Sequence, residues 1–217
     1  MKPIAHIHTD FPEKFGIPRQ AGLVPDLEGR VVFEPQYRIL DAVRGIEDFS
    51  HIWLLWEFSH SPNRWAPTVR PPRLGGNERM GVFATRSPIR PNPIGLSCVR
   101  LIRVNPGPEL QVAGADLVDG TPILDIKPYV SADVHPDAQF GFTVRNSDYR
   151  LQVRVPDELL RNVPSAKRDA LVGLLQEDPR PAYQRDERQY GVAFAGCNVR
   201  FHVEGEELIV DTITRLG

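Results

Sequence analysis

The sequence predicts a mainly β or α+β protein, with a small antiparallel β-barrel followed by a small C-terminal α+β domain. Short apolar segments alternate with tight turns through the first 130 residues, and almost no helical periodicity interrupts them before residue 150. The composition then becomes polar, and a helical pattern follows. Short strands with tight turns are typical of a small barrel and argue against a doubly wound sheet. We therefore expect domains at residues 1–135 and 136–217.

The barrel strands are expected wherever apolar residues run between turn signals. Residues 51–58 form a continuous aromatic and apolar run, which is typical of a strand buried on both sides. Asn105-Pro-Gly-Pro108 predicts a hairpin, and residues 40–44 predict a brief helical turn that Gly45 closes. The expected strands are residues 4–8, 31–33, 51–58, 80–85, 96–104, 109–115 and 123–126.

The C-terminal part begins after a polar stretch, residues 131–148, that reads as a linker. Ser165 is the expected N-cap of a helix from residue 166 to about residue 177, with leucines on one face. Asp178-Pro-Arg-Pro ends this helix. Residues 192–203 and 208–214 are expected to form a hairpin that turns at Gly205.

Residues 79–97 form the stretch around which the barrel is expected to be organised. Three prolines within six residues fix the backbone in extended geometry, so that Arg86, Arg90 and Asn92 point in set directions. Fixed guanidinium groups suit a site that holds an anion or a planar ring. A proline-braced turn between two strands is the alternative interpretation.

Charge is distributed unevenly along the chain. The net charge is −2, yet residues 64–103 contain eight arginines, no lysine and one acid, Glu78. Arginine without lysine favours bidentate contact with phosphate or carboxylate groups, although a solvated basic face would have the same composition.

Several other classes of site are not indicated. The nucleotide-binding glycine motifs and the serine-hydrolase elbow are absent. Cys98 and Cys197 are expected to be buried thiols, and His6 and His8 to be strand residues, so no metal is expected. The N-terminus lacks the apolar core of a signal peptide, which predicts a cytoplasmic protein without membrane segments. Polar loops at residues 18–20, 59–60 and 119–121 could converge with Arg86 at the barrel mouth.

Long motifs in the chain resemble the TsaA/TrmO family. They include Pro18-Arg-Gln-Ala-Gly-Leu, Met80-Gly-Val-Phe-Ala-Thr-Arg-Ser, Arg90-Pro-Asn-Pro-Ile-Gly and Asp116-Leu-Val-Asp-Gly-Thr-Pro, and the resemblance covers essentially the whole chain. It implies a TsaA-like β-barrel that binds S-adenosyl-L-methionine and methylates N6 of threonylcarbamoyladenosine beside the anticodon of tRNA. It also implies a homodimer.

The resemblance assigns cofactor binding to residues in four loops and one strand. These are Pro18, Arg19, Gln20, Ser59, His60, Arg86, Leu96, Asp119, Gly120, Thr121 and Pro122. The loop after Phe58 is one residue shorter than the family pattern, so Ser59-His60 either replaces the family's His-Gln pair or is shifted against it. Because the acceptor nitrogen carries a proton, a base could assist, and Asp119 and Asp125 are the candidates. Arg70, Arg73, Arg90 and Asn92 are candidates for contact with the tRNA anticodon stem-loop.

Two other functions remain compatible with the residues. One is a non-catalytic RNA-binding barrel that uses the same arginines. The other is a methyltransferase of the same fold that acts on a small molecule, with the arginines holding a carboxylate.

Overall fold

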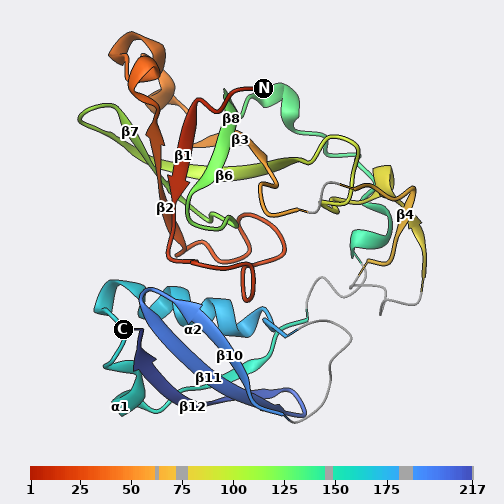
Figure 1. Ribbon diagram of the computed structural model, residues 1–217, viewed down its shortest axis with the longest axis vertical. Coiled ribbons are helices and arrows are strands. Elements are labelled where there is room, and N and C mark those ends of the chain that lie inside the picture. The colour runs from red at the N-terminus through yellow and green to blue at the C-terminus, as the bar shows by residue number, and fades with distance from the viewer. Residues whose placement is uncertain (62–63, 72–77, 145–148, 181–187, 217) are drawn as a thin grey trace.

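The computed structural model describes residues 1–61, 64–71, 78–144, 149–180 and 188–216. Six antiparallel strands close into a barrel in the order β1-β2-β7-β6-β3-β8, which confirms the predicted fold class (Figure 1). The strands are β1 (Ala5–His8), β2 (Glu28–Phe33), β3 (His51–Glu57), β6 (Ile94–Asn105), β7 (Glu109–Ala113) and β8 (Thr121–Pro128). Because the sheet closes on itself, the ends of distant segments meet at the barrel openings.

The barrel core follows from strand alternation. In β6, every second residue from Gly95 to Leu101 is buried, while the residues between them are more exposed. Ile7, Ile52, Leu54 and Ile123 fill the interior from the other strands. Ser97 lies in this inward row and is only 1% exposed, so its hydroxyl needs a partner inside the barrel.

The strand expected at residues 80–85 is mostly wrong. Only Met80–Gly81 is extended, as β5, and it pairs with β4 (Thr68–Val69) in a separate two-stranded ribbon. Val82–Ala84 form a 3-10 turn instead. The Thr85 backbone N–H and hydroxyl both donate to the Val82 carbonyl, at 3.1 and 2.9 Å. Side-chain bonds of this kind from Thr compete with the sheet ladder.

Further 3-10 turns connect the barrel strands. The turn expected at residues 40–44 is present as Leu40–Val43, and Gly45 follows it with φ +81°, a conformation that favours glycine. Among the described residues, Pro35–Tyr37 and Ile46–Asp48 form further 3-10 turns between barrel strands, whereas Ser131–Asp133, Gly141–Val144 and Ser165–Lys167 form such turns after β8. The stretch expected to be a linker therefore contains two short turns among its described residues.

The C-terminal part has a four-stranded sheet in the order β10-β11-β12-β9, covered by a helix. Its elements are β9 (Gln152–Arg154), α1 (Asp157–Leu160), α2 (Arg168–Gln176), β10 (Tyr190–Phe194), β11 (Cys197–Glu204) and β12 (Glu207–Arg215). The hairpin turning at Gly205 is confirmed, but the segment 192–203 is two strands because the chain turns at Ala195 and Gly196, both at positive φ. No helix within the described ranges is long and apolar enough to cross a membrane.

The N-terminus of α2 differs from the prediction. Ser165 begins a 3-10 turn, and α2 starts at Arg168 without a side-chain cap. Asp169 in the first turn offers the favourable negative charge there. The leucines of α2 are buried as the pattern predicts: Leu171, Leu174 and Leu175 are 0% exposed.

The long loop between β1 and β2 connects the two parts. In Figure 1 it extends from the barrel toward α2. Phe11, Val24 and Leu27 from this loop are at most 2% exposed and belong to the same apolar core as α2 and the C-terminal sheet. Lys167 Nζ also pairs with Asp10 Oδ2 at 2.7 Å. The loop that carries residues 18–20 is therefore anchored at both its beginning and its end by the C-terminal core. The domain division at residues 135 and 136 stays a prediction.

Candidate functional site

A cavity of about 350 Å³ opens at one end of the barrel. It is built from the β1–β2 loop, the end of β3, the arginine-rich arm before β6 and the start of β6 itself. The lining residues are Pro18, Arg19, Gln20, Trp56, Phe58, Thr85, Arg86, Arg90, Ile94, Gly95, Leu96 and Asp116. The structure thus brings six of the expected site residues together: Pro18, Arg19, Gln20, Arg86, Leu96 and Arg90.

A second cavity of about 190 Å³ adjoins the first and shares Trp56, Phe58 and Asp116 with it. It contains three more of the expected residues: Ser59, His60 and Thr121. Lys14, Ile17, Glu57, Ser61, Pro88, Leu117 and Val118 complete its lining. The two cavities form one bipartite cleft, with arginines in one half and a mixed polar and apolar surface in the other.

The arginines of the first cavity are held by neighbouring loops. Arg86 Nη1 donates to Gln20 Oε1 at 2.5 Å, and Gln20 Nε2 donates to the Arg19 carbonyl at 2.6 Å. This pair joins two loops that are 66 residues apart in the sequence. The Arg86 residue nevertheless remains exposed, so donors of its guanidinium group are available to an anion.

Arg90 has a structural contact in addition to its place in the cavity. Its Nη1 donates to the carbonyls of Thr85 and Ser87, at 2.9 and 3.2 Å. The backbone N–H groups of Ser87 and Ile89 donate to the hydroxyl oxygens of Thr85 and Ser87 and tighten the same turn. The arm is thus braced by hydrogen bonds as well as by proline, and its role in holding an anion or a planar ring stays a prediction.

A buried hydrogen-bonded chain ends at Asp116 on the boundary between the two cavities. Trp56 Nε1 donates to Ser97 Oγ at 2.9 Å, and Ser97 Oγ donates to Asp116 Oδ1 at 2.6 Å. Burial raises the pKa of the Asp116 carboxyl, although the Ser97 bond and the charge of Arg86 oppose the rise. A carboxyl with a raised pKa inside a cleft is a functional candidate.

Sequence reasoning missed Asp116. Asp116 belongs to the motif Asp116-Leu-Val-Asp119, yet the acids that the sequence indicates as candidate bases are Asp119 and Asp125. The available signal was burial: Ala115 and Leu117, on either side of Asp116, are both 1% exposed. An acid between two buried apolar residues must find partners inside the protein.

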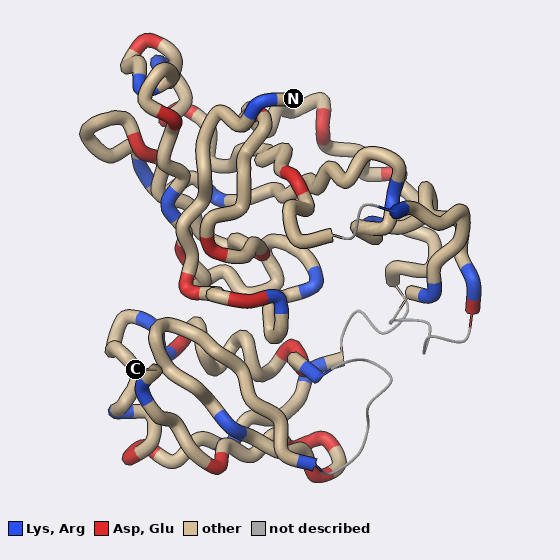
Figure 2. Tube along the Cα trace, viewed as in Figure 1, with Lys and Arg blue, Asp and Glu red and all other residues tan. Residues whose placement is uncertain are grey.

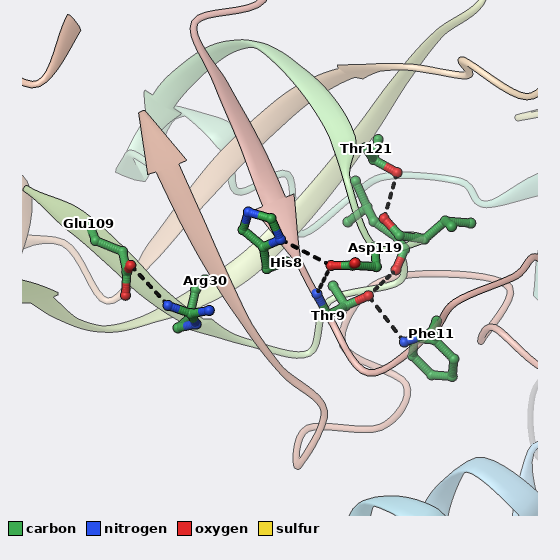
Figure 3. Close-up of polar contacts among 9 residues, drawn as sticks. His8, Thr9, Phe11, Arg30, Glu109, Asp119 and Thr121 are labelled. Carbon is green, nitrogen blue, oxygen red and sulfur yellow. Dashed lines mark hydrogen bonds and ion pairs between the residues drawn. The ribbon is translucent and has the colours of Figure 1, made fainter. Parts of the chain in front are cut away.

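Asp119 lies outside both cavities, where it fastens the loop to β1 (Figure 3). Its Oδ1 accepts the Thr9 backbone N–H at 3.1 Å and lies 3.2 Å from His8 Nδ1. The backbone N–H groups of Asp119 and Gly120 donate to the carbonyls of Phe11 and Ile7, both at 2.8 Å. These are the contacts of a turn carboxylate that satisfies backbone amides.

The other expected residues lie on the periphery. Asp125 pairs with Lys127, with Oδ2 and Nζ 2.8 Å apart, and lines neither cavity. Pro122 lies in β8 opposite His6, and Arg70 and Asn92 are exposed. Arg73 lies outside the described residues.

The histidines and cysteines are placed as structural residues. His6 and His8 lie in β1 and pair with Glu34 and Asp119. Cys197 is a buried free thiol, as expected, whereas Cys98 is free but only partly buried. Within the ranges that the structure describes, no three side chains of the kinds that bind metals gather at one place.

Arginine is concentrated on the side of the cleft. In Figure 2 the arm around β4 and β5 carries several Lys or Arg segments and very few acidic ones. A basic arm beside a partly buried cleft is the arrangement expected of an enzyme that acts on a polyanion. Fold and site together define a closed β-barrel protein with a polar cleft beside a basic arm.

Family models identify the particular enzyme family. The model of the tRNA-methyltransferase O N-terminal domain matches residues 6–133, and that of the TrmO C-terminal domain matches residues 148–216. The chain therefore belongs to the tRNA-methyltransferase O family. The resemblance that the sequence motifs indicate is confirmed over nearly the whole chain.

Individual relatives agree with this assignment. The Escherichia coli protein named tRNA (adenine(37)-N6)-methyltransferase is 42% identical over 92% of this chain and 91% of its own length. An Eikenella corrodens protein of the same name is 44% identical over 76% of this chain and 97% of its own. The crystal structure of TrmO from Pseudomonas aeruginosa has a TM-score of 0.79 and 34% identity, covering 98% of this chain and 97% of that one.

Proposed function

We propose that this protein transfers a methyl group from S-adenosyl-L-methionine to N6 of the threonylcarbamoyladenosine at position 37 of tRNA, beside the anticodon. The observation that carries the proposal is the bipartite cleft, which places Arg19, Gln20 and Arg86 beside a partly buried carboxyl. Both domains of the family are present in the same chain. The enzyme is cytoplasmic in this proposal, because its substrate is tRNA.

The lining of the cleft fits the methyl donor in chemical terms. The donor has a carboxylate, a cationic sulfonium and an adenine ring. Arg19 and Arg86 can pair with the carboxylate, as the planar guanidinium favours bidentate contact. Leu96 and the rings of Trp56 and Phe58, whose centroids are 4.2 Å apart, offer apolar surface to the adenine. A volume of about 350 Å³, extended by the second cavity, lies within the usual range for small-molecule sites.

The main contribution of the cleft residues to the reaction is to hold the two reactants in the correct orientation. S-adenosyl-L-methionine supplies an activated methyl group when bound, so the protein must align the acceptor nitrogen with it. Orientation of two reactants can contribute roughly 7–11 kcal/mol in favourable cases. The bond between Arg86 and Gln20 and the proline-braced arm keep the lining rigid, which is the property that alignment requires.

Roles on the periphery remain proposals. Ser59, His60 and Thr121 line the second cavity and are proposed to complete cofactor binding. We propose that Asp119, Gly120 and Pro122 fix the position of the loop that carries Thr121, through their contacts with β1 and the residues after it. Arg70, Arg90 and Asn92 are proposed tRNA contacts, together with Arg73 outside the described residues.

The first prediction tests the activity itself. We expect the purified protein to methylate tRNA that carries threonylcarbamoyladenosine, and nucleoside mass spectrometry should detect the methylated nucleoside. The same tRNA without the threonylcarbamoyl group is the control and should remain unmodified. Cofactor binding without transfer to tRNA would favour a small-molecule methyltransferase, and no cofactor binding would favour an RNA-binding barrel.

The second prediction concerns the donor's carboxylate. Arg86→Ala should weaken binding of S-adenosyl-L-methionine by roughly 10- to 100-fold, because a hydrogen bond to a charged group contributes about 1.5–3 kcal/mol. Isothermal titration calorimetry measures the change. Arg100→Ala, which removes an exposed arginine of β6 outside both cavities, is the matched control. Equal affinity of the Arg86 variant and the control would show that another group holds the carboxylate.

The third prediction concerns the tRNA backbone. Arg70→Ala should weaken tRNA binding and lower the slope of log K against log salt by about one, because one phosphate contact is lost. Binding of the cofactor should not change, since Arg70 lines neither cavity. Fluorescence anisotropy at several salt concentrations gives the slope. An unaltered slope would exclude Arg70 from contact with phosphate.

The fourth prediction concerns assembly. Large apolar side chains are exposed in several stretches of the chain, and we propose that two of these stretches contribute to a homodimer interface, since contiguous exposed apolar patches often mark protein–protein contacts. The residues are Trp65 and Phe83 in one stretch, and Val130, Val134, Phe140 and Val144 in the other. Sedimentation equilibrium should give twice the chain mass of 24.4 kDa. Phe83→Asp should shift the protein toward monomer, whereas Leu40→Asp at another exposed position should not. A monomeric wild type would refute the proposal.

A further inference from the structure

Asp116 occupies a position that the expected site residues do not. It lines both cavities of the cleft and therefore lies at the boundary between them. Because the proposed donor site spans both cavities, an acceptor nitrogen that reaches the donor's methyl group must approach this shared lining. The residue is partly exposed, which means that a bound molecule can reach it.

The carboxyl is held in a fixed orientation by neutral groups. Ser97 Oγ donates to Oδ1 at 2.6 Å, and Ser97 in turn receives the Trp56 indole N–H. Trp56 can lie there because it faces Gly95 across the β3–β6 ladder. A Cβ on Gly95 would lie 2.2 Å from Trp56 Cε2. No cation is paired with the carboxylate in the hydrogen bonds and ion pairs of the described residues, although the charge of Arg86 acts on it.

The charged groups around Asp116 come from several elements. The first cavity contributes Arg19, Arg86 and Arg90, and the second contributes Lys14, Glu57 and His60. Burial raises the pKa of Asp116 in spite of the Arg86 charge. A base whose pKa lies closer to neutrality than that of an ordinary carboxyl is more effective in proton transfer.

We propose that Asp116 is the general base of the methyl transfer, an inference that rests on the proposed function. The acceptor nitrogen carries one proton and is a weak nucleophile of the urea type. As the new N–CH3 bond forms and the S–CH3 bond of the donor breaks, the N–H bond breaks and its proton passes to the Asp116 carboxylate. The products are the methylated nucleoside, a neutral thioether and a neutral carboxyl, so atoms and charge balance.

Asp116 is better placed for this role than the two acids that the sequence indicated. Asp119 Oδ1 is engaged with Thr9 and His8 outside the cavities, and its side chain is 48% exposed. Asp125 pairs with Lys127 on the barrel wall. Asp119 and Asp125 are therefore solvent-exposed partners of other side chains, whereas Asp116 lines both cavities of the cleft.

The fifth prediction tests the base in single turnovers with saturating donor and modified tRNA. Wild-type rates should rise with pH with unit slope and then level off as Asp116 ionises. Asp116→Asn should lose this pH-dependent limb and at least about 100-fold in rate, the usual contribution of a general base. Asp41→Asn, which changes an exposed carboxyl that pairs with Arg44, is the matched control and should behave as wild type.

A measurement without substrates provides an independent readout. Because the pKa of Asp116 is raised in the folded state, its protonation stabilises the fold at low pH, and this stabilisation is lost as pH rises through the folded pKa. Denaturant unfolding at a series of pH values should therefore show a decline that Asp116→Asn lacks. Ser97→Ala removes a bond that lowers this pKa, so it should move the limb of the rate profile to higher pH.

The outcomes separate the two proposals. A wild-type protein without transfer to tRNA would overturn the proposed function, and the base would fall with it. An active wild type whose Asp116→Asn variant retains its rate within threefold, with the same pH profile, would overturn the base alone. If Asp119→Asn or Asp125→Asn lost the pH-dependent rise in rate and Asp116→Asn kept it, the assignment of Asp116 as the base would likewise be overturned. Should Asp116→Asn not fold, an unchanged limb in Ser97→Ala would overturn the proposal.

Discussion

Contact between Trp56 and Gly95 is the constraint on which the cleft depends. The two residues face each other across β3 and β6, and the indole occupies the space where any side chain at position 95 would lie. This places the indole N–H at Ser97 and the Ser97 hydroxyl at Asp116. An apolar packing contact inside the barrel therefore determines where a carboxyl stands in the cleft. Gly95 also ends the proline-rich arm and lines the first cavity, so the end of the arm is part of the cleft lining.

The C-terminal part supports the same cleft by packing against the β1–β2 loop. The β1–β2 loop contributes Phe11, Val24 and Leu27 to the core beneath α2, and between these anchors it carries Pro18, Arg19 and Gln20. Gly16 lies at positive φ against Val192, which leaves no room there for a side chain. The loop thus has the rigidity of a packed core although it belongs by sequence to the barrel. Such support is what a site built on loops needs to hold its ligands in fixed geometry.

Strand alternation and turn chemistry made the closed barrel predictable, because inward-facing residues and tight turns leave direct marks in the sequence. The region of residues 80–85 was harder: its apolar residues resemble a strand, yet Thr85 bonds to Val82 and folds the chain into a turn. The Ser165 cap failed for a related reason. The chain enters α2 through a 3-10 turn, so the first residues of the pattern are not the first residues of the helix.

The cleft was predictable as a set of loops, and its chemistry was only partly so. Arg19, Gln20 and Arg86 could be singled out because they lie in long family motifs. Asp116 also lies in such a motif, but its bond to Ser97 and the contact of Ser97 with Trp56 depend on packing across the barrel. A carboxyl whose pKa is raised by burial destabilises the fold once it ionises, which is a cost that a purely structural residue has no reason to carry. Asparagine could offer Ser97 the same acceptor without that cost. The proposed role of Asp116 as a base rests on its place in both cavities and on the fixed orientation that Ser97 gives its carboxyl.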